Sequence, residues 1–178
     1  SAVDVNAQRS IMEVYELAND SSVTRVAAEG GKAGPVWSAA VPKGATGFRV
    51  TQGDIPAAAV AFGQGHVSVF APIAPGLAQL AFSYSLPASA FPLSVPIESP
   101  TQILEVLVED EKGSVSGAQL KEKPPVSLER RSFRRFLADD VPERAVSVID
   151  LSATPHSSVD SRYLVILTPV IGGPMIAA

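Results

Sequence analysis

The sequence contains no cysteine, which removes several kinds of chemistry at once. A disulfide framework, a zinc–cysteine site, an iron–sulfur cluster and thiol catalysis all require that residue. The absence favours an exported protein over a cytosolic one. The small residues Ser1, Ala2 and Val3 are also of the kind that follows cleavage of a leader. We therefore expect an extracytoplasmic protein on the periplasmic side of a membrane.

A basic surface and long helices are lacking as well. The 178 residues carry 14 Lys and Arg against 18 Asp and Glu, whereas binding to nucleic acid requires a basic face. The 15 prolines and 13 glycines are spread along the whole chain. Inside a helix, proline costs about 3 kcal/mol and glycine about 1 kcal/mol. We therefore expect no nucleic-acid partner, and a fold made of short strands joined by turns.

Alternating apolar and polar residues indicate strands along most of the chain. In residues 77–86, the side chains of Leu80, Phe82, Tyr84 and Leu86 share one side, and small or polar residues occupy the other. This period of two is typical of a strand with one buried face. Further strands are expected within 9–17, 35–41, 47–51, 66–70, 103–109 and 145–151.

The spacing of these strands predicts the fold class. Roughly ten short strands, with a turn signal about every ten residues, are typical of an all-β, immunoglobulin-like antiparallel β-sandwich. We assign this domain to residues 1–158. Only short helical turns are expected, within 55–61 and 137–143. Pro124 and Pro125 indicate an edge segment, because proline is confined to the edges and ends of sheets.

The residues that could carry catalysis or bind a metal form no recognisable motif. The two histidines, His66 and His156, have no cysteine partners, and no Gly-x-Ser-x-Gly motif is present. Glu105 and Glu109 lie on one expected strand about 13 Å apart, too far from each other to share a calcium ion. We therefore expect a protein that is not an enzyme, without catalytic residues, metal or cofactor.

Four arginines form a basic cluster in this acidic chain: Arg130, Arg131, Arg134 and Arg135. In an extended strand neither side of the segment would be purely apolar. One interpretation is an edge strand whose charges prevent pairing with another sheet. The other is a contact with anionic lipid headgroups or an acidic partner, to which each cation contributes about 1 kcal/mol. The four residues are therefore candidate contacts with a partner or a membrane.

The sequence ends in an uncharged run, residues 163–178, that admits two interpretations. As a helix it would reach about 24 Å, short of the roughly 30 Å hydrocarbon core of a bilayer. Alternatively, residues 163–167 are a strand buried on both faces, followed by an apolar docking tail. We favour a membrane anchor, or its beginning, over residues 159–178. The residues expected to contact lipid or a partner are Tyr163, Leu164, Val165, Ile166, Leu167, Val170, Ile171, Met175 and Ile176.

Several strand-and-turn segments are similar to those of a known family. They are residues 11–20, 41–45, 71–76, 80–87 and 103–108, followed by the apolar run. In this respect the chain resembles bacterial exported proteins of the carboxypeptidase regulatory-like type. In those proteins a β-sandwich of about this size precedes a C-terminal membrane helix, and no catalytic residue is carried over. The resemblance implies a non-enzymatic β domain that is held at a membrane and faces the cell envelope.

Together these features predict an accessory or structural subunit of a membrane-associated assembly. Its contacts with other protein subunits would come from loops, a sheet edge and the apolar run, which would also contact the bilayer. The alternative function is a carbohydrate- or ligand-binding module of an envelope protein. Trp37 and Tyr15 are the aromatic side chains that would form its binding platform. A hydrolase with an unrecognised site is a third, minor interpretation.

Overall fold

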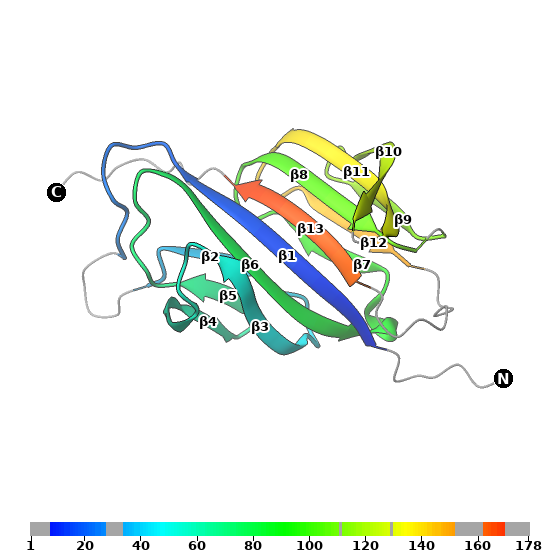
Figure 1. Ribbon diagram of the computed structural model, residues 1–178, viewed down its shortest axis with the longest axis horizontal. Helices are drawn as coiled ribbons and strands as arrows, with labels where there is room; N and C mark the ends of the chain where they lie inside the picture. Colours follow the sequence, from blue (N-terminus) through cyan, green and yellow to red (C-terminus); the bar gives the residue numbers. More distant parts are fainter. Residues whose placement is uncertain (1–7, 28–33, 111, 129, 152–161, 170–178) are drawn as a thin grey trace.

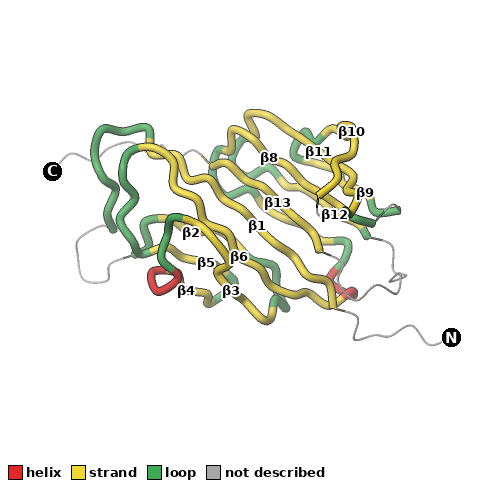
Figure 2. The backbone as a smooth tube through the Cα atoms, in the orientation of Figure 1, coloured by secondary structure: helices red, strands yellow, loops and turns green. Residues whose placement is uncertain are grey.

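A computed structural model describes residues 8–27, 34–110, 112–128, 130–151 and, for the backbone alone, 162–169. These residues form strands and two short 3₁₀ turns, η1 (Ala57–Ala59) and η2 (Ala88–Ala90), without an α-helix (Figures 1 and 2). The expected all-β class is therefore confirmed. The strands are β1 (Gln8–Asn19), β2 (Trp37–Ala40), β3 (Thr46–Gly53), β4 (Val60–Gly63), β5 (His66–Val69), β6 (Gly76–Pro87), β7 (Leu93–Pro96), β8 (Thr101–Val108), β9 (Ser114–Gly117), β10 (Lys121–Leu128), β11 (Arg131–Val141), β12 (Val146–Asp150) and β13 (Arg162–Pro169).

The strands form one large sheet and two small ones. The large sheet has seven strands in the order β10-β11-β8-β13-β1-β6-β3, and the small sheets are β7-β12-β9 and β2-β5-β4. Strands β1 to β6 build one end of this arrangement, and strands β7 to β13 build the other (Figure 1). In the large sheet the two halves meet where β1 runs parallel to β13, whereas the other described strand pairs are antiparallel.

Both small sheets pack against the same face of the large sheet. Successive side chains of a strand alternate between its two faces, so Ile11 and Tyr15 of β1 point the same way. The Tyr15 ring meets the ring of Trp37 on β2, with 4.7 Å between their centroids. Ile11 lines a small cavity together with Leu93 of β7 and Ile149 of β12. The result is a β-sandwich-like arrangement with the hydrophobic core between the layers.

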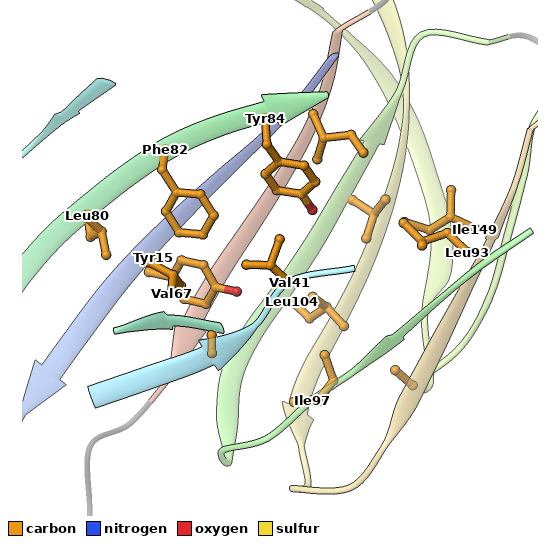
Figure 3. Packing of buried hydrophobic residues seen from close by; sticks show 14 of the residues in the cluster. Tyr15, Val41, Val67, Leu80, Phe82, Tyr84, Leu93, Ile97, Leu104 and Ile149 are labelled. Carbon is orange, nitrogen blue, oxygen red and sulfur yellow. The ribbon is translucent and has the colours of Figure 1, made fainter. Parts of the chain in front are cut away.

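Strand β6 shows how the sequence pattern becomes core. The side chains of Leu80, Phe82, Tyr84 and Leu86 are all buried, as the alternation predicts, and Figure 3 shows three of them side by side. Each fully buried side chain of this size contributes roughly 1.5–3 kcal/mol to folding. The residues between them lie on the opposite face of the sheet.

Of the two short helical turns that the sequence predicts, one is present in part and the other is absent. The turn expected within 55–61 is present in part, because η1 follows Pro56. The helical turn expected within 137–143 is wrong, because β11 continues to Val141 and ends before Pro142. Leu137 and Ala138 pair with residues of β8 along this stretch, so backbone pairing in the sheet replaces the local bonds of a turn.

The C-terminal apolar run contributes a strand of the large sheet. Residues 162–169 form β13, which pairs with β1 on one side and β8 on the other. This part of the run follows the strand interpretation, and the preference for a helix is wrong here, because a β-branched run suits a strand with two neighbours. Among the described residues, no helix is long and apolar enough to cross a membrane. Val170, Ile171, Met175 and Ile176 lie outside the described residues.

Candidate functional site

A groove lies where the edges of the two small sheets face each other. Its walls include Ser38 and Ala40 of β2 on one side and Pro96 and Glu98 on the other. Tyr15 of β1 contributes to its floor, together with Trp37. The enclosed part of the groove is small, about 30 Å³, and the rest is open to solvent. Its accessible lining is mainly apolar, with the Glu98 carboxylate and the Ser38 hydroxyl as polar groups and two buried aromatic rings beneath.

Among the described residues, no strand pairs with β2 on the groove side. In an antiparallel pair, the residues whose N–H and C=O groups bond to the neighbouring strand alternate along the chain. The Val41 N–H donates to the Gly65 carbonyl oxygen at 2.7 Å, and the same register continues through β2 and β5. Ser38 and Ala40 therefore direct their backbone N–H and C=O groups away from β5. These groups lie along the groove.

The facing edge of β7 is different, because it contains a proline. The Ile97 N–H donates to the Ala145 carbonyl oxygen at 2.8 Å, which fixes the alternation along β7 and β12. Ser94 and Pro96 are thus the residues whose backbone faces away from β12. Since proline has no N–H, β7 has one hydrogen-bond donor fewer on this side.

Glu98 places a carboxylate at the mouth of the groove. Its Oε1 atom lies 3.6 Å from Nε2 of His66 on β5, and this pair is ionic only when the imidazole is protonated. Both side chains are partly exposed. The charge of Glu98 is one of the smaller causes that raise the pKa of the Tyr15 hydroxyl, after burial and Glu13. The negative charge therefore acts on the aromatic floor of the groove.

A second polar cluster lies in the core behind Tyr15. Glu13 of β1 is only 4% exposed. Its carboxylate accepts hydrogen bonds from the Tyr15 hydroxyl at 2.7 Å and from the Tyr84 hydroxyl at 2.5 Å. Because β1 pairs with β6, Tyr84 lies opposite Ile11 and within reach of Glu13. The cluster thus joins the two strands through side chains as well as through the backbone.

Burial sets the protonation of this cluster. It raises the pKa of Glu13 above its ordinary value, and the two hydroxyl donors oppose this rise only in part. Burial, followed by the charge of Glu13, raises the pKa of both Tyr15 and Tyr84 well above the ordinary value. The tyrosines therefore keep their protons and act as donors. The buried carboxyl group and its two donors thus form one hydrogen-bonded cluster.

Sequence reasoning missed Glu13 and Glu98, although a signal for the first was present. Ile11, Glu13 and Tyr15 share one side of β1 by simple alternation, so two of the neighbours of Glu13 on that side are buried. The segment looked mixed because acidic residues occur on both of its sides. No local sequence signal marks Glu98. It lies beside the groove because β2, a segment distant in sequence, lines the same groove.

The arginine cluster does not form an edge strand. Residues 131–135 belong to β11, which has β10 on one side and β8 on the other. Arg130 precedes the strand and is exposed. Three of the arginines pair with glutamates of other strands or of the turn after β8. The pairs are Arg131 with Glu109 at 2.7 Å, Arg134 with Glu122 at 2.8 Å, and Arg135 with Glu105.

Because β11 lies between β10 and β8, the interpretation of the arginine cluster as an edge strand is wrong. The charges of three of its arginines are matched by glutamates of neighbouring segments. The edge of the sheet is β10, where Pro124 and Pro125 coincide with a shift in register, as the sequence predicts. The bond to Arg134 lowers the pKa of the Glu122 carboxyl. Phe136 of β11 belongs to the hydrophobic core, whereas Phe133, which is also buried, points to the opposite face of the large sheet. Three arginines of β11 therefore form ion pairs with β10, with β8 and with the turn after β8.

Within the described residues, the aromatic and histidine side chains that the sequence offers as binding residues do not form an exposed site. Trp37 and Tyr15 are both buried, so neither offers the exposed platform that a sugar-binding module needs. His66 lies on β5 beside Glu98, and His156 lies outside the described residues. In the part of the chain that the structure describes, no three His, Asp or Glu side chains gather as metal ligands would.

No protein-family model, curated protein or solved structure matches the chain. The resemblance to carboxypeptidase regulatory-like proteins therefore stays a prediction from the strand-and-turn segments. The functional proposal rests on the geometry of the sheets, the groove and the exposed faces.

Proposed function

We propose that this chain is a non-catalytic, immunoglobulin-like β-sandwich module that binds other proteins. In this proposal it serves as an accessory or structural subunit of a membrane-associated assembly, on the extracytoplasmic side. The observation that carries the proposal is the second face of the large sheet. Among the described residues, no element lies in front of β1 and β8 on that face (Figure 1).

This second face carries apolar side chains near its centre. Met12 and Val14 alternate with the core residues of β1, so they point away from the small sheets, and both are only half-buried. Ile103 of β8 is 43% exposed. An apolar region on a sheet is normally buried against another layer, and an exposed one is typical of a protein contact. A partner protein that covers this face would supply the missing layer.

The membrane setting of the proposal comes from the sequence. Residues 170–178 follow β13 without a charge, and Val170, Ile171, Met175 and Ile176 are the proposed contacts with lipid or with an apolar partner. The resemblance to exported proteins supports the same setting. Since Arg131, Arg134 and Arg135 are paired within the domain, the proposal does not depend on them.

Site-specific cross-linking in cells tests the proposal. A photoreactive amino acid at position 103 should form adducts with other proteins of the membrane fraction. The matched control is position 146, because Val146 is 45% exposed but lies on a small sheet, at the other side of the domain. Equal adducts from both positions, or none from position 103, would contradict a partner on the large sheet.

A further inference from the structure

The groove between the small sheets has the features of a second contact, independent of the large sheet. Ser38 and Ala40 direct their backbone N–H and C=O groups along it, and no strand in the described part of the chain pairs with them there. Edge strands commonly carry proline or charge, which prevents pairing with another chain. Strand β2 reads Trp-Ser-Ala-Ala and has neither. Its free edge can therefore accept the backbone of another extended segment.

The chemistry of the groove selects the side chain that such a segment would carry. Glu98 supplies a carboxylate at the mouth, and Trp37 and Tyr15 supply aromatic rings below it. A carboxylate pairs with an ammonium or guanidinium group. The chain has a formal charge of −4, which favours the approach of a basic segment.

We propose that the groove binds an extended segment of a partner protein, which adds to β2 as a strand and places a Lys or Arg side chain against Glu98. Pairing with the four residues of β2 needs a segment of about the same length, or roughly 13 Å of extended chain. The backbone bonds of Ser38 and Ala40 give the segment its direction, and Glu98 selects its basic residue. Pro96 directs the pairing to β2, because β7 lacks a donor at that position.

Binding of synthetic peptides tests the strand addition. The probes are capped eight-residue peptides of alternating Val and Thr, with Lys, Arg, Glu or norleucine near the centre. Trp37 is the only tryptophan and lies in the groove, so its fluorescence reports occupancy. We expect the Lys and Arg peptides to bind at least about tenfold more tightly than the Glu and norleucine peptides. Equal affinities, or no binding at all, would overturn the proposal.

Methylation of peptide nitrogens tests the backbone contact. Peptides that carry N-methyl groups on every second residue lose the donors of one edge and keep those of the other. One methylation pattern should abolish binding, and the complementary pattern should preserve it. If both patterns bind as well as the unmethylated peptide, the segment does not add as a strand.

A pair of variants tests the role of Glu98. Glu98→Gln should weaken binding of the Lys peptide about tenfold and leave the norleucine peptide unchanged. Glu16→Gln is the matched control, because it removes the same charge from the opposite face of β1. It should bind like the original chain, and an equal loss in both variants would reject a local contact. These results are separate from those of cross-linking at position 103, so either proposal can fail alone.

Discussion

Glu13 is an acidic group that the fold has removed from water and given two tyrosine donors. Burying a charge is costly unless hydrogen bonds compensate for the loss of water. Here the compensation is incomplete, since the pKa of Glu13 remains raised. The cluster therefore makes the stability of the domain depend on pH in a direction opposite to that of a carboxylate in an ion pair.

The pH dependence of unfolding tests this effect of Glu13. Because the pKa is higher in the folded state, the folded protein binds more protons, and the stabilisation of Glu13 is fully present below its unfolded pKa. It is lost as the pH rises through the raised folded pKa. In Glu13→Gln, which has no titrating group, we expect this part of the pH dependence to disappear. Denaturant unfolding at a series of pH values measures it, and parallel curves for the two proteins would contradict the account.

Tyr84→Phe tests the donors of the same cluster. The substitution removes the hydroxyl that lies 2.5 Å from Glu13 and leaves one carboxylate oxygen without its donor. A hydrogen bond contributes roughly 0.5–3 kcal/mol, most when one partner is charged, and we expect a loss within this range in the free energy of unfolding. In the Glu13→Gln background the same change should cost less. An equal cost in both backgrounds would show that the contribution of the Tyr84 hydroxyl does not depend on the Glu13 carboxyl group.

Strands and their ends were predictable to the extent that local signals determine them. The alternation in residues 77–86 specifies β6, and Pro124 with Pro125 specifies the edge at β10. The partners of a strand depend on contacts distant in sequence, so they were not predictable. Residues 131–135 looked like an edge because their partners Glu105 and Glu122 belong to two other strands.

The edge strand β10 illustrates how the fold limits pairing with other chains. It is one of the longer edges of the sheets, and its two prolines interrupt the row of donors. We expect the double variant Pro124→Val, Pro125→Val to self-associate, which light scattering would detect. Pro100→Val, in the exposed segment before β8, is the control and should remain as dispersed as the original chain. Equal scattering from all three would contradict the protective role of the prolines.

The whole molecule depends on a strand that the sequence alone left ambiguous. Each half of the chain builds its own small sheet and its own part of the large sheet, and β13 connects them by pairing with β1 and β8. Six residue pairs define the register between β1 and β13. The apolar run that favours a membrane helix also suits a strand that has a neighbour on each side in a sheet. What favours the strand over a membrane helix is that β1 and β8 are available as its pairing partners.

Amide hydrogen exchange of residues 163–168, measured without lipid or detergent, tests this architecture most directly. Since β13 is paired on both sides, we expect these amides to exchange at least about a thousandfold more slowly than in an unstructured peptide, as the amides of β1 do. Exchange at the rate of a free peptide, while β1 remains protected, would contradict the central strand.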